Sequence, residues 1–413
     1  MNELRDEHYV RAVTELGDTH KIVTSQDIYS KNGVMLVASG VAITSKLYDR
    51  LVHHVLLKPL DLSLSSEQVI NAETIWRDTQ NLILGNSKLE RMVDIIDKGF
   101  PLRKGILSIH LPKTLTFKLT VAREKYPDIY QRSLSILIMC VYLARCDGMS
   151  LDEEGYMIIA ALFHDMGMLH INPVLLDPHH VMSREERRHL YAHPLTAYLF
   201  LHEFPELPRY IADAVLDHHE RMDGRGYPRG LRGNKISRYA QILAIAEVSA
   251  RALEPSATLD QWKKLEWMLK LNYKQFGSGL IGHLSVLRDG SDADVTVNSC
   301  DTDALVAQVR LIAKLLEDFG QYSDAGHSNE VYDFAQARLA GLRLELLEAG
   351  FDPHDPEELI QRFIDDPDCV PEYEPLLQET HWQLKTLVLD ISRHWPEQER
   401  SKEVNYAWLG DIS

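Results

Sequence analysis

The chain has 413 residues, of which 45% are hydrophobic and 25% are charged, as in ordinary soluble globular proteins. This length exceeds the usual size of one hydrophobic core, so two or three domains are expected. The formal net charge of −17 argues against a general DNA-binding surface, because phosphate backbones are held by net positive patches.

Cysteine usage and hydropathy indicate the compartment. The four cysteines, Cys140, Cys146, Cys300 and Cys369, form no Cys-x-x-Cys pair, so neither a disulfide framework nor a zinc ribbon is indicated. No long uncharged apolar run would cross a membrane, and the start of the chain lacks the apolar core of a signal peptide. We therefore expect a cytoplasmic protein without membrane contact.

Residues 1–115 are predicted to form a small α/β domain. The apolar run Val34–Ala38 lies between turn residues and predicts a strand, and Leu56-Leu57 indicates another. Ser65-x-x-Gln68 has the form of a helix capping box, and the apolar spacing that follows predicts a helix over residues 69–84. Because no catalytic constellation occurs here, we expect a regulatory or dimerisation role.

Residues 116–290 are predicted to form a helical domain. Pro127 suits the first turn of a helix whose apolar residues recur at helical spacing. A capping box at Ser150-x-x-Glu153 then predicts a helix over residues 151–163, which delivers His164-Asp165 at its end.

Two further helices carry histidines in this domain. Ser183-x-x-Glu186 predicts a helix that carries His193 until Pro194 interrupts it. The pattern of residues 211–219 predicts another helix, which ends in two histidines. Imidazole and carboxylate groups are ligands that divalent transition metals prefer. Helix ends that converge on one point would therefore make a metal site.

The order of these motifs resembles the HD-GYP family, a bacterial branch of the HD metal-dependent phosphohydrolases. The resemblance covers roughly residues 120–290 and rests on His164-Asp165, His193, His218-His219-Glu220 and Asp223-Gly224-Arg225-Gly226-Tyr227-Pro228. It implies a mainly α, HD-type fold and a cyclic di-GMP phosphodiesterase in which a metal-bound hydroxide attacks the phosphodiester. The implied cofactor is a divalent metal, two ions of iron or manganese, and the implied ligand is cyclic di-GMP or a related cyclic dinucleotide.

The resemblance also implies roles for individual residues. Catalysis falls to Asp165 and His164. The implied metal ligands are His164, Asp165, His193, His218, His219 and Glu247, with Asp128 as a further acidic candidate that could instead pair with Arg132 along its helix. The implied substrate-binding residues are Arg221, Asp223, Gly224, Arg225, Gly226, Tyr227 and Pro228, in a loop segment over 221–238 that holds six basic residues against one acid.

Three positions depart from the family pattern. Arg132 stands where the family has its first metal-binding histidine, Met168 replaces a lysine, and Glu247 replaces an aspartate. A guanidinium cannot coordinate a cation. Two hypotheses therefore stay open: an active phosphodiesterase, and a catalytically degenerate signalling protein that binds nucleotide or a protein partner without turnover.

Residues 296–413 are predicted to form a C-terminal helical region of unassigned role. Amphipathic patterns indicate helices over 302–319, 329–349, 356–364 and 373–394, and a further helix over 262–273 precedes them. Homodimerisation or docking of a protein partner is the expected role of such a bundle.

Overall fold

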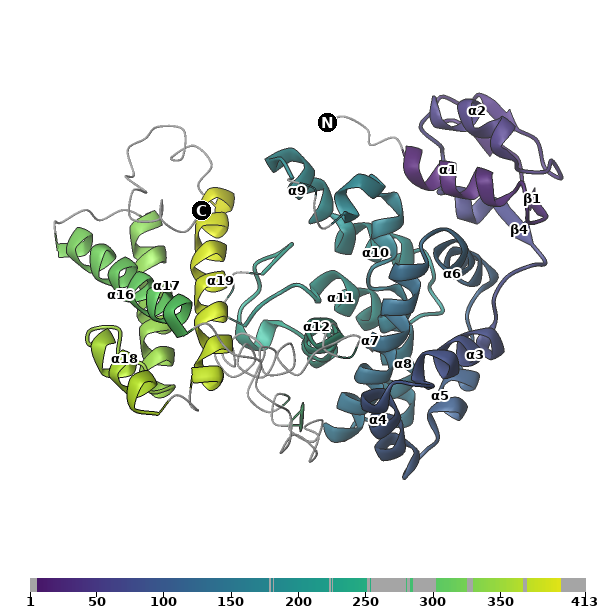
Figure 1. Ribbon diagram of the computed structural model, residues 1–413. Helices are drawn as coiled ribbons and strands as arrows, with labels where there is room; N and C mark the ends of the chain where they lie inside the picture. The colour runs from purple at the N-terminus through teal and green to yellow at the C-terminus, as the bar shows by residue number, and fades with distance from the viewer. Residues whose placement is uncertain are drawn as a thin grey trace. The chain divides into compact units, whose positions relative to one another are not determined.

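The structure, a computed structural model, divides into two compact units (Figure 1). Unit 1 comprises Met1–Ser256 and Gln275–Leu287, and unit 2 comprises Ala257–Lys274 and Arg288–Ser413. The structure describes residues 6–177, 180, 182–222, 224, 226–250, 253, 280, 283–284, 302–324, 330–366 and 370–394. Helices dominate both units, which confirms the mainly α fold class. The predicted helix over 262–273 lies outside the described residues, and the three-domain division remains a prediction.

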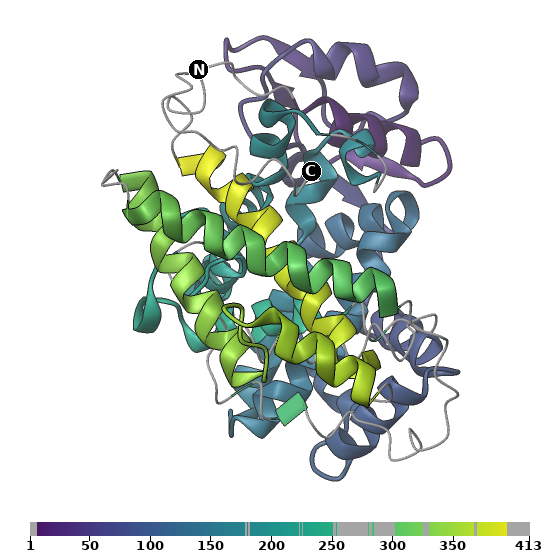
Figure 2. The same cartoon turned by 60° about the vertical axis from the view of Figure 1, so that its left-hand side comes forward.

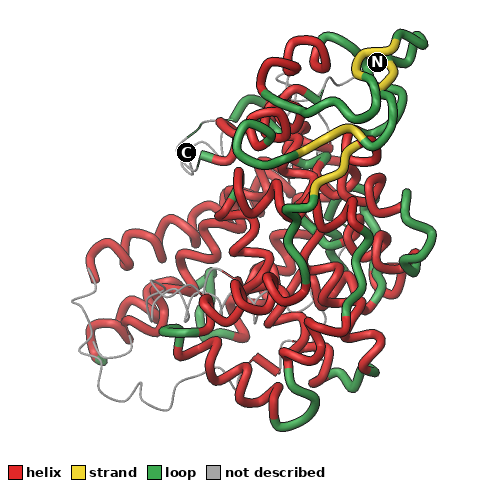
Figure 3. Tube along the Cα trace, turned by 90° about the vertical axis from the view of Figure 1, so that its right-hand side faces the viewer, coloured by secondary structure: helices red, strands yellow, loops and turns green. Residues whose placement is uncertain are grey.

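Four short strands lie in the N-terminal part of unit 1, and Figure 3 shows them in yellow within a largely helical chain. Helices α1 (Glu7–Leu16) and α2 (Tyr48–Val52) accompany them. The strands form two antiparallel pairs: β1 (Ile22–Thr24) with β4 (Leu64–Ser66), and β2 (Ile28–Tyr29) with β3 (Met35–Val37).

The sequence predictions for this part met mixed outcomes. Strand β3 confirms the strand expected over 34–38, whereas Leu56 forms only an isolated bridge with Ser30. The capping box at Ser65 was wrong, because Ser65 lies in β4 opposite Val23. A strand partner thus decided the conformation of this serine, which local sequence could not reveal.

Four helices lead from the strands to the core of unit 1. They are α3 (Ala72–Ile83), α4 (Ser87–Asp97), α5 (Leu102–Ser108) and α6 (Lys113–Lys125). Helix α3 confirms the helix predicted over 69–84, although it begins later, where the side chain of Asn71 accepts a hydrogen bond of 2.9 Å from the Thr74 amide. Asparagine at this position satisfies an amide that would otherwise lack a partner.

Helices α7 (Pro127–Cys146) and α8 (Leu151–Phe163) form the centre of unit 1 and pack against each other. Both bury nearly all their apolar side chains. The predicted capping box at the start of α8 is confirmed, since Ser150 and Glu153 exchange hydrogen bonds between side chain and backbone. This box fixes where α8 begins and therefore where its last turn presents His164.

The remaining helices of unit 1 complete the surroundings of the histidines. They are α9 (Arg184–Leu190), α10 (His193–His202), α11 (Arg209–Asp217) and α12 (Arg238–Ala250), with a 3-10 helix over Met166–His170. The capping box at Ser183 is confirmed, but the prediction that its helix carries His193 was wrong. Because proline is accommodated in the first turn of a helix, Pro194 starts α10 instead of ending α9.

The described residues of unit 2 are mostly helical. Its helices are α16 (Thr302–Asp324), α17 (Glu330–Glu348), α18 (Pro356–Asp365) and α19 (Val370–His394). All four predicted helices of this region are confirmed. Figure 2 shows these helices packed together, and α16, α17 and α19 contact one another around a common apolar core that includes Ile312, Leu342 and Leu384. Over the ranges that the structure describes, no helix is both long and apolar enough to cross a membrane.

Candidate metal centre

Four histidines and one aspartate of unit 1 meet where three helices begin or end. His164 follows the last residue of α8, with Asp165 next to it, His193 is the first residue of α10, and His218-His219 directly follow α11. Three of the imidazoles are at most 1% exposed, and Asp165 is 5% exposed. The structure therefore brings together the histidines and the aspartate that the sequence singled out.

Backbone carbonyls orient three of these imidazoles. Each accepts a hydrogen bond from the Nδ1 of a histidine three residues later: His164 to Ala161 (2.8 Å), His193 to Leu190 (2.7 Å) and His218 to Val215 (2.6 Å). With the proton on Nδ1, a neutral imidazole has a lone pair on Nε2. Such hydrogen bonds fix the tautomer and ring orientation of metal-binding histidines.

The Nε2 atoms point toward one another. The Nε2 of His193 lies 3.4 Å from that of His218 and 3.2 Å from that of His219. When both rings are neutral, these hydrogen bonds place the proton of His193 and of His218 on Nδ1, so that the contact between them joins two lone pairs. We call His193, His218 and His219 the histidine cluster, since their ligand atoms all lie within 4.8 Å of one another.

Asp165 completes the donor set of the histidine cluster. Its Oδ1 lies 3.3 Å from the Nε2 of His193, and its Oδ2 lies 3.2 Å from the Nε2 of His164. Both Asp165 Oδ1 and His164 Nε2 are buried without a hydrogen-bond partner. Buried acceptors without donors are costly, and a divalent cation would satisfy them at once. The residues present therefore fit a metal ion.

The ionisation of His218, His219 and Asp165 is compatible with metal binding, whereas His164 would have to lose a proton to act as a ligand. Burial, together with the neighbouring imidazoles, holds the pKa of His218 and of His219 well below the ordinary value, which keeps both rings neutral. Burial opposes ionisation of Asp165, but His164 and His193 outweigh it and hold the pKa of that carboxyl well below its usual range. For His164, burial is likewise outweighed by the Asp165 carboxylate, which raises its pKa.

Arg132 and Glu247 form an ion pair at the edge of the centre. Arg132 lies on α7 and Glu247 on α12, and the Nη2 of Arg132 donates a hydrogen bond of 3.2 Å to the Oε1 of Glu247. The other oxygen of Glu247 lies 3.7 Å from His218 Nε2 and 3.6 Å from His219 Nδ1. The sequence identified both positions as departures, but did not indicate that the two side chains bind each other.

The other two positions in question lie apart from this ion pair. Asp128 is exposed in the first turn of α7, and no hydrogen bond or ion pair joins it to Arg132 within the described part of the chain. Met168 lies half-buried in the 3-10 helix that follows Asp165. Arg132 thus pairs across two helices and not along its own helix.

Glu220 organises the loop that follows the histidine pair. Its buried carboxylate accepts hydrogen bonds from three consecutive backbone amides: Arg229 (2.5 Å), Gly230 (3.0 Å) and Leu231 (2.8 Å). A carboxylate that caps several amides fixes a turn strongly. Sequence reasoning gave Glu220 no role, although an acid beside a histidine pair and before a glycine-rich loop was the available signal.

The loop closes directly onto the histidine pair. The Tyr227 amide donates a hydrogen bond of 3.1 Å to the His219 carbonyl, and the Tyr227 ring stacks on the His219 imidazole with 4.5 Å between centroids. A side chain at Gly226 would lie 2.3 Å from the Glu220 Cα, so only glycine fits there. Tyr227 and Gly226 therefore position His219, and Asp223 and Arg225 lie outside the described residues.

Among the described basic residues of the 221–238 segment, Arg229 and Arg238 bind protein carboxylates. Arg229 binds Asp217 through Nε at 2.9 Å and through Nη2, and Arg238 binds Asp147 in the same two-pronged manner. Arg229 and Arg238 lie outside the residues 221–228 that are expected to bind substrate, and that expectation stays a prediction. Arg221, half-buried beside the histidine pair, is the described arginine of the segment nearest in sequence to the centre.

Gly167 allows the two halves of the centre to approach. A Cβ at this position would lie 2.1 Å from the carbonyl oxygen of His193. The backbone that carries Asp165 and the backbone that carries His193 thus touch at Gly167, and any larger residue would force them apart. The sequence motif contained this glycine, but its contact with α10 depends on the tertiary packing.

A second buried charged cluster lies in unit 1, between its N-terminal part and the core. Lys118 of α6 is 1% exposed and donates a hydrogen bond of 3.0 Å to Asp61. The Tyr9 hydroxyl donates to the other oxygen of Asp61, and the Lys118 ammonium lies over the rings of Tyr9 and Phe200, 3.9 and 4.2 Å from their centroids. This cluster satisfies its own charges.

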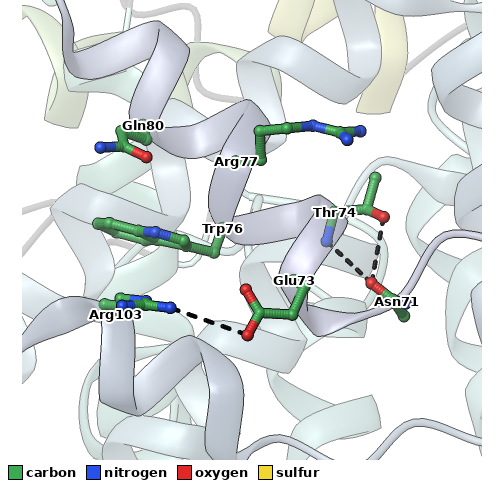
Figure 4. Close-up of a pocket in the computed structure, with 7 residues that line it drawn as sticks. All are labelled: Asn71, Glu73, Thr74, Trp76, Arg77, Gln80 and Arg103. Atoms are coloured by element: carbon green, nitrogen blue, oxygen red, sulfur yellow. Dashed lines mark hydrogen bonds and ion pairs between the residues drawn. The ribbon is translucent and has the colours of Figure 1, made fainter.

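A separate hollow of about 680 Å³ lies on α3 and α5, away from the histidines (Figure 4). Arg103 lies 3.9 Å from Glu73 across it, and Asn71 is occupied in capping α3. Its lining residues bring no nucleophile and no metal ligand set together, so it offers no alternative active site.

Comparisons with known proteins identify the central segment. Residues 119–263 match the HD domain family. The 3'3'-cGAMP-specific phosphodiesterase 1 of Vibrio cholerae is 30% identical over 138 residues, a match that covers 31% of this chain and 30% of that protein. The cyclic di-GMP phosphodiesterase response regulator RpfG of Xanthomonas campestris is 37% identical over 123 residues, covering 27% and 32%. The chain thus spans less than a third of the length of these curated relatives.

A solved structure is also similar. It is that of a HDG"Y"P protein from Bdellovibrio bacteriovorus, with 16% sequence identity and a TM-score of 0.36, over 64% of this chain and 94% of that chain. The family match over 119–263 confirms the resemblance drawn from the sequence motifs.

Proposed function

We propose that the protein, whose residues 119–263 match the HD domain family, is a metal-dependent phosphodiesterase that hydrolyses cyclic di-GMP or a related cyclic dinucleotide. The names of its relatives support this substrate class, since they act on cyclic di-GMP and on 3'3'-cGAMP. The observation that carries the proposal is the histidine cluster, in which buried Nε2 lone pairs face one another beside the unpartnered Oδ1 of Asp165.

The histidine cluster and Asp165 would hold a divalent metal, iron or manganese, with His164 and Glu247 beside them. When bound, such an ion acts as a Lewis acid that lowers the pKa of water and stabilises the leaving oxygen of a phosphodiester. The Asp165 carboxylate, which His164 and His193 keep ionised, can accept a hydrogen bond from an attacking water and hold it in line. His164, whose ring Asp165 and the Ala161 carbonyl orient, keeps that carboxylate in place.

The loop after the histidine pair would receive the substrate. The residues proposed to bind it are Arg221, Asp223, Gly224, Arg225, Gly226, Tyr227 and Pro228. Stacking of Tyr227 on His219 leaves a continuous ring surface beside the centre, and arginine binds phosphate oxygens through several N–H groups. The backbone at Gly224 has a φ of 81°, which glycine adopts without strain and which shapes the turn.

A second candidate function is favoured by one observation, the Arg132–Glu247 ion pair. Glu247 is a predicted metal ligand, but its Oε1 already accepts a hydrogen bond from the Arg132 guanidinium, which cannot itself coordinate a metal. With Met168 in place of a lysine, the protein would then bind a cyclic dinucleotide or a protein partner without hydrolysing it. Dimerisation or partner docking by unit 2, and a cytoplasmic location, also remain proposals.

Hydrolysis assays separate the two functions. The purified protein is incubated with cyclic di-GMP and, separately, with 3'3'-cGAMP, and linear products are separated by chromatography. We expect product from at least one substrate, and an Asp165→Asn variant should lose at least about 100-fold of the rate, since it removes an ionised ligand. Absence of product with both substrates, together with retained nucleotide binding, would establish the second function instead.

A further inference from the structure

Glu247 links a guanidinium to the histidine cluster. Its Oε1 accepts the hydrogen bond from Arg132, while its Oε2 faces His218 and His219 at 3.7 and 3.6 Å. A glutamate is one methylene longer than an aspartate, and this length lets the carboxylate span both neighbours. The carboxylate is therefore shared between a fixed cation and two imidazoles.

Arg132 supplies the positive charge that Glu247 needs. The Glu247 side chain is 12% exposed, so its charge must be balanced within the protein. Burial and the nearby Asp165 carboxylate raise the pKa of Glu247 above its ordinary value, and Arg132 opposes this rise and favours the ionised carboxylate. A guanidinium stays charged at every accessible pH and has no lone pair for a metal, so it acts as a permanent cation.

The net charge of the centre favours binding of one divalent ion and disfavours a second. Asp165 and Glu247 contribute two negative charges and Arg132 one positive charge, which leaves a single negative charge when the histidines are neutral. Binding of one divalent ion therefore already makes the net charge of the centre positive. A second ion near Glu247 would lie close to the guanidinium, and like charges at such short range repel each other.

We propose that Arg132 takes the place of a second metal ion, so that the centre binds one divalent ion, at the histidine cluster and Asp165, and not the two expected from the sequence. This inference rests on the proposed function, because it presupposes that the centre holds metal. It assigns Arg132 as a positioning residue that holds Glu247 and sets the number of ions.

The same two helices provide a matched control. Helices α7 and α12 are joined at one end by Arg132 and Glu247, and at the other end by Asp147 and Arg238, whose Nε lies 2.8 Å from the Asp147 Oδ2. Arg238→Gln removes a bridge between these helices without touching the histidine cluster. It therefore reproduces the structural effect of losing Arg132, but not its effect on the metal.

The test counts metal ions per chain. The full-length protein and the variants Arg132→His and Arg238→Gln are saturated with Mn²⁺ and passed through a desalting column, and bound manganese is then measured by mass spectrometry of the metal. We expect one ion per chain in the natural protein and in Arg238→Gln. Arg132→His should bind two, because the imidazole supplies a ligand and the fixed charge is gone. Circular dichroism confirms that each variant is folded.

Several outcomes would overturn the inference. Two ions, or none, in the natural protein would contradict it whatever the variants do, and so would an Arg132→His variant that is folded and still binds only one. If Arg132→His fails to fold, Arg132→Gln replaces it, and Glu247 freed from its partner should then raise manganese binding above one ion. One ion per chain without any hydrolysis would contradict the proposed function but leave this inference standing.

Discussion

Unit 1 contains two buried clusters of charged and polar groups, and they are satisfied in different ways. Around Lys118 and Asp61, every charge meets a partner: the ammonium binds the carboxylate and two aromatic rings, and the Tyr9 hydroxyl binds the remaining oxygen. In the metal centre, by contrast, Asp165 Oδ1 and His164 Nε2 are buried without a hydrogen-bond partner.

This difference separates a structural cluster from the proposed metal site. A buried ion pair with complete partners holds elements together, in this case α1 and α6 with the 3-10 helix Leu60–Ser63 that contains Asp61. Oriented acceptors without donors are unfavourable, and a bound cation would satisfy them, which supports the metal site proposed above. The Arg132–Glu247 pair lies between the two types, because one carboxylate oxygen has a cation and the other faces the imidazoles.

The largest expected effect is on stability, from breaking the self-satisfied cluster. Lys118→Met leaves Asp61 buried without its cation, and we expect a loss of about 3–5 kcal/mol in the free energy of unfolding. Urea unfolding measures it. The double variant Asp61→Asn/Lys118→Met should recover part of this loss, and metal content should be unchanged in both. A loss of metal in Lys118→Met would break the distinction between the clusters.

Next in size is the effect of removing the central imidazole. His193→Gln removes the nitrogen that contacts Asp165, His218 and His219, and metal affinity should fall by at least about 100-fold. His170→Gln is the control, because this histidine binds Asp6 beside the structural cluster. Titration with a competing chelator gives both affinities, and equal losses in the two variants would contradict the account.

A smaller effect is expected from the contact between the two halves of the centre. Gly167→Ala places a Cβ against the His193 carbonyl and should cost about 1–3 kcal/mol of stability through overpacking, together with some metal affinity. In Gly155→Ala, on the neighbouring helix α8, the new Cβ meets nothing within 4 Å, and stability should rise by up to about 1 kcal/mol. Thermal unfolding measures both changes. A lower melting temperature for Gly167→Ala and a higher one for Gly155→Ala would support the account, and changes in the same direction would contradict it.

The smallest effect is the pH dependence of the metal-free protein. The pKa of His218 and His219 is lowered in the folded state, so the unfolded chain binds more protons once the pH falls below about 6.5. Stability should therefore fall with decreasing pH, by up to about 1.4 kcal/mol per pH unit for each such histidine. The raised pKa of His164 acts in the opposite direction.

A matched variant isolates the contribution of one histidine to this slope. His218→Asn removes one of the two imidazoles with a lowered pKa, so its unfolding free energy should depend less steeply on pH than that of the natural protein. Urea unfolding at several pH values in the presence of a chelator provides the comparison. An unchanged slope would show that His218 does not titrate differently in the folded and unfolded states.

Local signals allowed much of the fold and of the centre to be predicted. The capping boxes at Ser150 and Ser183 gave the starts of α8 and α9, and the spacing of the histidines indicated a common site, since each follows or begins a helix. Helical periodicity was sufficient for the helices of unit 2. These features depend on residues a few positions apart, and sequence patterns report such distances well.

Features that depend on packing between distant segments could not be predicted. The partner of Arg132 lies 115 residues away on α12, and only the packing of α7 against α12 brings it close. Likewise, Ser65 lies in a strand because it pairs with the strand at residues 22–24. The carboxylate of Glu220 accepts hydrogen bonds from backbone amides that follow it by nine or more residues, and only the turn between them brings them close. Pro194 was misjudged because its effect depends on whether it begins a helix or interrupts one.

Metal-dependent turnover tests the central claim most directly. The protein is stripped of metal with a chelator, and Mn²⁺ is then added back in steps while hydrolysis of cyclic di-GMP is followed. The account predicts no turnover without metal, a rate that rises in proportion to the metal added, and a break at one ion per chain. A rate that survives chelation, or the absence of hydrolysis at every ratio of metal to protein, would contradict it.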